Sequence, residues 1–323
     1  MGVGMTSSRS ILDRSSFVVP QQTLPCSRFC IVTLVLIAII DIAWVALTPL
    51  QMHPSTPSFI ASVATSAAAA LVLARYFCSN LRLQILLKGF TFLLAAWPVL
   101  RLFNHLTTTI PIPLADAKLA SWDQMIGFDW PAYVGWVDRH PALLQMMSYT
   151  YTGLTAYTCL LFLILALAGP EPQRRCSELI ELFVATALIC MLIGIAFPAL
   201  APTAYYTLPS GTFEHIDQSL GTGHVSYLND LRDNPSHELN LAVLPGLVTF
   251  PSFHTAMGVI AIYCARGSAL IFPPILVINL LMIGSTPVFG SHYGVDIIGG
   301  AIVTGLVILS RYAILHQRGR TAS

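Results

Sequence analysis

The chain has 323 residues, of which 55% are hydrophobic and 10% are charged, and its formal net charge at pH 7 is +1. The mean hydropathy of +0.72, with repeated apolar runs near the length of a bilayer span, excludes a soluble domain and indicates a multispanning membrane protein. The small net charge, and the lack of a compact Lys or Arg patch in the sequence, argue against a nucleic-acid partner.

The first 28 residues are polar, contain several Ser and Arg, and precede a long apolar segment. A removable signal peptide ends in a small-residue cleavage site, and the sequence shows no convincing one here. We therefore expect residues 1–28 to form a cytoplasmic tail, and the first apolar segment to act as an uncleaved signal anchor.

Eight apolar segments follow this tail, so we predict an all-α fold, a polytopic bundle of about eight transmembrane helices. We place them at residues 29–48, 59–78, 83–103, 142–168, 177–198, 253–270, 271–287 and 293–315. The sixth and seventh have on the order of 18 residues each, about 27 Å of helix, which barely crosses a bilayer core. The turn between them is expected at residues 266–268, where an Arg can reach the membrane surface, with Pro273-Pro274 as a competing break.

The charges in the loops assign the two sides of the membrane. With eight helices, twelve Lys and Arg residues fall on the side of both termini and four on the opposite side. The four are Arg101, Lys118, Arg139 and Arg232. By the positive-inside rule both termini are cytoplasmic, and the opposite loops face a periplasm or a lumen, at the inner membrane if the protein is bacterial.

These assignments divide the chain into five parts. They are the tail at 1–28, N-terminal helices at 29–103, an outward segment at 104–141, a helical core at 142–315 that carries the motifs described below, and a cytoplasmic tail at 316–323. None of the seven cysteines falls in an outward loop, so no disulfide is expected.

Two outward segments are long. The first mixes Trp and Asp, as in Trp122-Asp123 and Asp129-Trp130, and we expect an amphipathic helix or a re-entrant turn at the interface near residues 113–140. An interfacial Trp belt is favoured there over a substrate contact. The second segment, residues 199–252, carries three histidines without regular ligand spacing, which favours loop positions over a metal site. These histidines are His215, His224 and His237.

Two short motifs stand where a polar loop enters an apolar helix: Pro251-Ser252-Phe253-His254 and Ser291-His292-Tyr293-Gly294-Val295-Asp296. His292 and Asp296 are four apart, so on a helix they share a face and the carboxylate can hold the imidazole in one tautomer. The two intervening helices return His254 to the same side. Ser252 and Ser291 could be simple N-caps, but three ionisable groups converging at the membrane edge favour a functional site.

Two histidines and an aspartate, without a cysteine or an evident nucleophilic serine, suit phosphoryl transfer. One histidine can attack phosphorus while the aspartate stabilises the cation that forms, and the other can protonate the leaving oxygen. The phosphate would face two helix N-termini, whose N–H groups and dipoles favour an anion. We therefore predict a phosphohistidine mechanism.

The motifs resemble those of the type 2 phosphatidic acid phosphatase superfamily, whose second motif reads Pro-Ser-x-His and whose third reads Ser-Arg-x5-His-x3-Asp. Residues 251–254 fit the second, and Ser285, His292 and Asp296 fall in register with the third. The resemblance implies that His292 is the nucleophile, that Asp296 orients it, and that His254 is the acid for the leaving alcohol and then the base for the acceptor. It also implies a membrane lipid substrate, with Ser252, Ser285 and Ser291 as candidate binding residues.

The chain departs from this superfamily in two places. Thr286 stands where the third motif has Arg, and the Lys-x6-Arg-Pro first motif is absent from the sequence. Gly-Ser-His-Tyr-x-x-Asp resembles the branch of inositol-phosphorylceramide synthases and their bacterial relatives, and is similar to sphingomyelin synthases. That branch transfers a phospho-headgroup from a lipid to an acceptor alcohol. Arg101, at the outward end of the third helix, is a candidate to neutralise the phosphate, with interfacial anchoring as the alternative.

Three alternatives stay open at this point. Water instead of an alcohol could take the phosphoryl group, which would make the protein a lipid-phosphate phosphatase. Two histidines and a carboxylate could bind a metal in a membrane-bound hydrolase or oxygenase. A transporter could use Asp41 and Asp296 as relay groups, although Asp41 alone suits helix packing better. The sequence has no P-loop or dinucleotide fingerprint, so no cofactor is expected.

Overall fold

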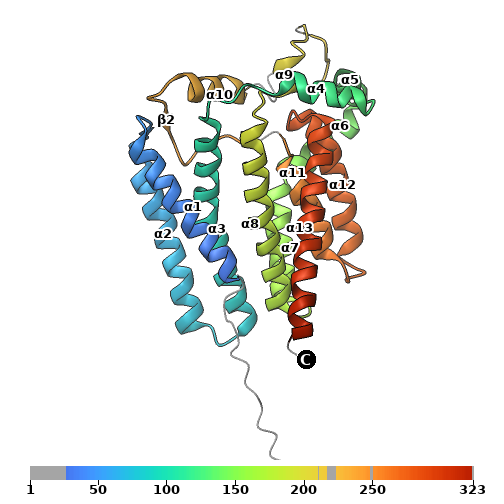
Figure 1. The fold of residues 1–323 in the computed structure, drawn as a ribbon. Coiled ribbons are helices and arrows are strands. Elements are labelled where there is room, and N and C mark those ends of the chain that lie inside the picture. The colour runs from blue at the N-terminus through green and yellow to red at the C-terminus, as the bar shows by residue number, and fades with distance from the viewer. Residues whose placement is uncertain (1–26, 210, 217–222, 248–249, 322–323) are drawn as a thin grey trace, which may run out of the picture.

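The computed structural model describes residues 27–209, 211–216, 223–247 and 250–321. Long helices run side by side, and short helices lie across the end opposite the C-terminus (Figure 1). The only strands in this part of the chain, β1 (Gln51–Met52) and β2 (Glu238–Leu239), pair in parallel over two residues each. The predicted all-α membrane bundle is therefore confirmed.

Six of the described helices are long and apolar enough to cross a membrane. They are α1 (Arg28–Leu47), α2 (Thr56–Val72) with its π-helical continuation η1 (Leu73–Phe77), α3 (Leu81–Thr108), α8 (Pro172–Ala196), α12 (Phe272–Phe289) and α13 (Gly294–Thr321). A helix satisfies its own backbone hydrogen bonds, which is why an apolar helical segment is stable in lipid.

The two remaining predicted spans are less regular. The fourth consists of α6 (Pro141–Thr152) and α7 (Leu154–Leu167), which are bent by 57° at Gly153. The sixth is α11 (Phe253–Ala265), an apolar helix of only 13 residues. By length and composition, the described helices support six spans, or seven with the bent pair, instead of eight full-length crossings.

The turn predicted at residues 266–268 is confirmed. Helix α11 ends at Ala265, and Gly267 has a φ of +85°, a left-handed conformation that glycine adopts without a Cβ clash. Helix α12 begins at Phe272, with the two prolines in its first turn, where a missing N–H costs no intrahelical bond. The predicted end of the sixth helix at residue 270 is wrong, because the chain has already left the helix at Gly267.

Helix α8 joins the two halves of the bundle. It packs against α1 and α3 on one side and against α7, α11 and α13 on the other (Figure 1). Helix α11 is surrounded by α7, α8, α12 and α13, so the motif at its start is set in the middle of the C-terminal half. On α1, Ile37 and Asp41 lie four apart on the buried stripe, and the 2% exposure of Asp41 fits the predicted packing role.

Four short helices cover the end of the bundle opposite the C-terminus (Figure 1). They are α4 (Asp116–Met125), α5 (Trp130–Asp138), α9 (Pro202–Tyr205) and α10 (Gly223–Asp233). The first two match the interfacial segment predicted near residues 113–140. The Trp-belt interpretation is wrong for Trp130, whose side chain is 2% exposed and donates from Nε1 to the Pro287 carbonyl oxygen at 2.9 Å. Trp130 holds α5 against α12.

At the opposite end, one buried carboxylate links three helices. Glu178 on α8 accepts hydrogen bonds from Arg266, after α11, at 2.7 Å and from Arg311 on α13 at 3.1 Å. Arg175 lies 3.8 Å away, and Glu181 makes a second ion pair with Arg311 at 2.8 Å. Because the Glu178 side chain is 4% exposed, its charge is weakly screened and holds these helix ends together.

We predict that Glu178→Gln lowers the thermal unfolding midpoint of the protein in detergent. Breaking a fully buried ion pair costs about 3–5 kcal/mol, and the loss is smaller here because the Arg266 side chain is 35% exposed. The matched control is Glu171→Gln, which breaks an exposed pair with Arg174 and should leave the midpoint nearly unchanged. Equal effects of the two substitutions in differential scanning fluorimetry would contradict this account.

Candidate active site

The two motifs meet at the end of the bundle that the short helices cover. The imidazole of His254, at the start of α11, and that of His292, just before α13, have ring centroids 6.0 Å apart, at an interplanar angle of 63°. His292 and Asp296 are buried, and His254 is partly accessible. The structure thus brings together the three residues that the sequence singled out.

The starts of α11 and α13 are in direct backbone contact. The Ser252 N–H donates to the Asp296 carbonyl oxygen at 2.9 Å. A Cβ atom at Gly300 would lie only 2.2 Å from the Ser252 carbonyl oxygen, a distance that no side chain tolerates. Glycine at this turn of α13 therefore lets the helices approach closely enough for His254 and His292 to share one site.

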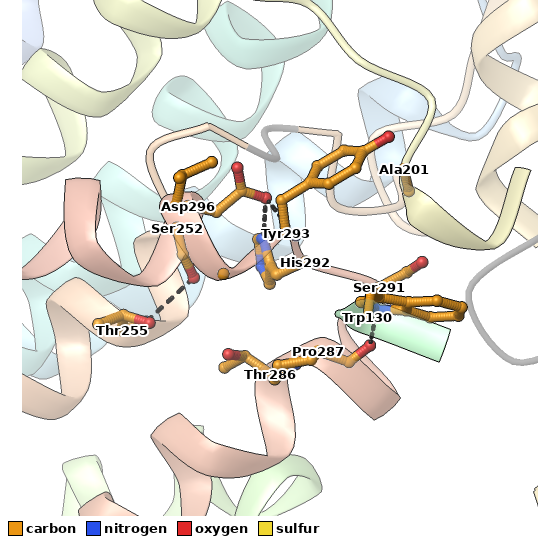
Figure 2. A network of polar contacts seen from close by, with 12 residues as sticks. Trp130, Ala201, Ser252, Thr255, Thr286, Pro287, Ser291, His292, Tyr293 and Asp296 are labelled. Atoms are coloured by element: carbon orange, nitrogen blue, oxygen red, sulfur yellow. Dashed lines mark hydrogen bonds and ion pairs between the residues drawn. The ribbon is translucent and has the colours of Figure 1, made fainter. Parts of the chain in front are cut away.

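His292 is held in one tautomer. Its Nδ1 lies 3.1 Å from Asp296 Oδ2, and the same oxygen accepts the Tyr293 N–H at 3.0 Å (Figure 2). With Oδ2 as the acceptor of both bonds, Nδ1 donates and Nε2 carries the ring lone pair. This is the state of histidine that can act as a nucleophile, with a carboxylate behind it to stabilise the cation formed on attack.

Helix α4 holds the loop that leads into α13. Asp123 accepts the N–H of Gly294 at 2.9 Å and that of Val295 at 2.8 Å, so it caps α13 from another helix. Asp116, two turns earlier on the same face of α4, accepts the Tyr293 hydroxyl at 2.9 Å. We call these contacts the α4 clamp. They fix the backbone on the C-terminal side of His292.

Burial shapes the electrostatics of the α4 clamp. It raises the pKa of the Asp123 carboxyl, a rise that the two N–H donors oppose. Burial and the neighbouring Asp116 carboxylate raise the pKa of the Tyr293 phenol, so this hydroxyl stays protonated and keeps donating. Asp116 also accepts the N–H groups of Leu200 and Ala201, each at 2.9 Å. The clamp therefore ties the loop after α8 to the loop before α13.

Two non-glycine residues beside the clamp have positive φ angles. Ala201 has a φ of +113° and Ser291 a φ of +47°. Ser291 Oγ lies 2.7 Å from Thr203 Oγ1 and accepts the Thr203 N–H at 3.2 Å. Such strained residues persist only where their surroundings hold them, and they cluster at functional sites. Ser291, predicted to bind substrate, thus contacts Thr203 on helix α9.

The prediction that a phosphate would meet the N-terminus of α13 is wrong. The Asp123 carboxylate already accepts the first two N–H groups there, and its own negative charge disfavours an anion at that position. At α11, Ser252 acts as the predicted N-cap, because its Oγ accepts the Thr255 N–H at 3.3 Å (Figure 2). Side chains are therefore the better candidates to hold a phosphate.

The side chains of Ser285, Thr286 and Arg101 make their described contacts away from the two histidines, although the Thr286 carbonyl oxygen accepts the His292 N–H at 3.3 Å. Ser285 Oγ donates to the Met282 carbonyl oxygen at 2.6 Å, and Thr286 Oγ1 makes the same kind of bond within α12. Arg101 donates to the Leu244 carbonyl oxygen, and its guanidinium carbon lies 5.0 Å from the ring centroid of Trp97. These contacts fit interfacial anchoring of Arg101, which was the alternative weighed from the sequence.

Three residues around the site were not predicted from the sequence to belong to it. The ring of Tyr151 stacks on that of His254, with centroids 4.7 Å apart and planes 19° from parallel. Tyr151 lies in the last turn of α6, just before the bend, and no sequence pattern pairs it with His254. Asp116 and Asp123 are seven positions apart, so the sequence could have placed both carboxylates on one face of a helix. Their partners lie far along the chain and could not have been predicted in this way.

Two of the three outward histidines make side-chain contacts away from the two motifs. His224 on α10 donates from Nε2 to the Leu200 carbonyl oxygen at 2.8 Å, and burial lowers its pKa, so it is neutral at pH 7. His237 pairs with Asp230. Among the described residues, no group of three or more His, Cys, Asp or Glu side chains is arranged to hold a metal ion.

A family model described as the PAP2 superfamily matches residues 117–310, more than half of the chain and the part that runs from α4 to α13. Neither a curated protein nor a solved structure matches the chain.

We predict that Asp123→Ala loosens the loop that precedes α13. The substitution removes the acceptor of two buried N–H groups, each of which costs roughly 1–3 kcal/mol when it is left unpaired. Amide hydrogen exchange of residues 291–296 should therefore speed up. The matched control is Asp129→Ala, which removes an exposed cap of α5 that accepts only the Ala132 N–H. Unchanged exchange in Asp123→Ala would show that the clamp does not hold the loop.

Proposed function

The chain belongs to the PAP2 superfamily, and from this premise we propose that it is an integral membrane lipid phosphatase or phosphotransferase that works through a phosphohistidine. One observation carries the proposal. The buried His292 is oriented by Asp296, and the His254 ring stands 6.0 Å from it, as a nucleophile and a general acid require. The substrate is a membrane lipid with a phosphoester in its headgroup.

In the first step, Nε2 of His292 attacks the phosphorus of the lipid. The N–P bond forms as the P–O bond to the lipid alcohol breaks, and His254 gives its proton to the leaving oxygen. Asp296, hydrogen-bonded through the Nδ1 proton, stabilises the positive charge that develops on the imidazole. The products are a free lipid alcohol and a phosphohistidine that still carries the headgroup.

In the second step, an acceptor hydroxyl attacks the phosphorus from the side that the lipid alcohol has left. His254, now neutral, takes the proton of that hydroxyl, and the N–P bond breaks to return the neutral His292. An acceptor alcohol gives headgroup transfer, whereas water gives hydrolysis. We favour transfer, because His292 and Asp296 are buried and because the Gly-Ser-His-Tyr-x-x-Asp segment resembles the transferase branch. Simple lipid-phosphate hydrolysis is the alternative.

We further propose that the site faces the extracytoplasmic side. The loops at the site's end of the bundle belong to the side with four Lys and Arg residues, against twelve on the side of the termini. Helices α4, α5 and α10 lie across that end, opposite the C-terminus (Figure 1). With both termini cytoplasmic, the lipid would reach His292 from the outer leaflet.

We predict that His292→Ala abolishes both the phosphoenzyme and the product, with turnover reduced about a thousandfold or more. His254→Ala should lower turnover by about a hundredfold or more, with a phosphoenzyme that forms poorly or persists. The assay gives purified protein a panel of labelled phospholipids and acceptor alcohols, and it separates released phosphate from transferred headgroup.

The matched control for these variants is His140→Ala, since His140 is exposed and its ring bonds to the Trp136 carbonyl oxygen within its own turn. It should leave turnover unchanged. Turnover that survives in His292→Ala would refute the proposed mechanism.

We also predict that the reaction does not require a divalent metal. The Nδ1 atom of His292 is engaged by Asp296, so the two motifs supply an acid and a nucleophile without a metal. Activity measured after dialysis against EDTA should equal that of the untreated protein. Loss of activity that is restored by one added metal ion would instead favour the metal-dependent alternative.

A further inference from the structure

The proposed reaction needs a lasting positive charge beside the phosphate, and the two motifs contain no Lys or Arg. Thr286 stands where the resemblance expects an arginine. The first two N–H groups of α13 are occupied by Asp123. The phosphate must therefore find a cationic side chain elsewhere at this end of the bundle. Four cations are assigned to this side of the membrane: Arg101, Lys118, Arg139 and Arg232.

Two of the four cations donate hydrogen bonds to backbone carbonyl oxygens. Arg101 donates to Leu244, and Arg232 donates to Ile112 at 2.6 Å. Both contacts anchor the outward loops to the region around α3, so moving either guanidinium would cost those bonds. Arg139 is exposed at the end of α5, a helix that packs on α6 and α12.

Lys118 differs from the other three because it lies on α4, the helix that forms the clamp. It is exposed, and its Nζ lies 5.1 Å from the ring centroid of Trp122 and 5.0 Å from that of Phe197. Among the described residues it makes no ion pair with a carboxylate. Two aromatic faces thus hold an ammonium that has no anionic partner.

The aromatic rings that contact Lys118 pack against residues next to the candidate active site. Trp122, Phe197 and Phe250 contact one another, with centroids 5.3 to 5.8 Å apart. We call them the aromatic triad. They pack in one apolar cluster with Tyr293, the residue after His292. Phe250 also comes directly before the Pro251-Ser252-Phe253-His254 motif, so the triad borders both motifs.

We propose that Lys118 and the aromatic triad form the docking site for the phosphate of the incoming lipid. This inference rests on the proposed function. The ammonium pairs with the negatively charged phosphodiester, and the triad contacts the apolar part of the lipid next to it. The flexible four-carbon stem of lysine lets the ammonium leave the rings while it stays paired with the phosphate. Lys118 thus replaces the cation that the motifs lack.

Kinetics of Lys118→Gln and Lys118→Arg test this docking role. In mixed micelles of phospholipid and neutral detergent, Lys118→Gln should raise the KM for the lipid about tenfold with kcat little changed, as expected for one lost charge-assisted hydrogen bond. Lys118→Arg should restore most of the affinity. Added salt should raise the KM of the unmodified protein more than that of Lys118→Gln. Arg139→Gln, an exposed cation on the same side, is the control and should change neither constant.

A binding measurement separates this inference from the proposed function. Energy transfer from tryptophan is measured to dansyl-labelled phosphatidylglycerol and to dansyl-labelled diacylglycerol, which lacks the phosphate. Lys118→Gln should weaken binding of the first and leave the second unchanged, whether or not the protein turns the lipid over. Equal affinities of Lys118→Gln and the unmodified protein for phosphatidylglycerol would overturn the docking site, while turnover through His292 would still stand.

Discussion

The backbone at the start of α13 is held by two carboxylates of α4, and the rest of the candidate site depends on this contact. Asp123 accepts the N–H groups of Gly294 and Val295, and Asp116 accepts the Tyr293 hydroxyl. A carboxylate that caps a helix from outside both satisfies the N–H groups and complements the helix dipole. Because the Tyr293 backbone is fixed, the preceding His292 has one orientation relative to Asp296.

The clamp also explains how charge is distributed. Carboxylates that stabilise the start of α13 keep an anion away from it, so the phosphate is expected at the edge of the site, where Lys118 stands on the same helix as the clamp. At the other end of the bundle, Glu178 holds Arg266 and Arg311. Both polar clusters lie near helix ends, and each joins helices by hydrogen bonds in addition to apolar packing.

Contacts between neighbours in sequence were predictable, and contacts between distant segments were not. His292 and Asp296 are four residues apart, so helical geometry alone pairs them. Gly267 indicates a turn because glycine readily adopts the positive φ found there. Asp123 and Gly294 are 171 residues apart, and nothing in a single sequence pairs them. The stacking of Tyr151 on His254 and the burial of Trp130 depend in the same way on packing between distant helices.

The central claim is that the headgroup passes through a covalent intermediate on His292. The stereochemical course at phosphorus tests it most directly, with a phospholipid that carries one sulfur at a phosphorus of known configuration and with methanol as the acceptor. Two successive in-line displacements each invert the phosphorus, so the account predicts net retention in the methyl ester product, read by ³¹P NMR. Net inversion would mean a single direct displacement and would contradict the account.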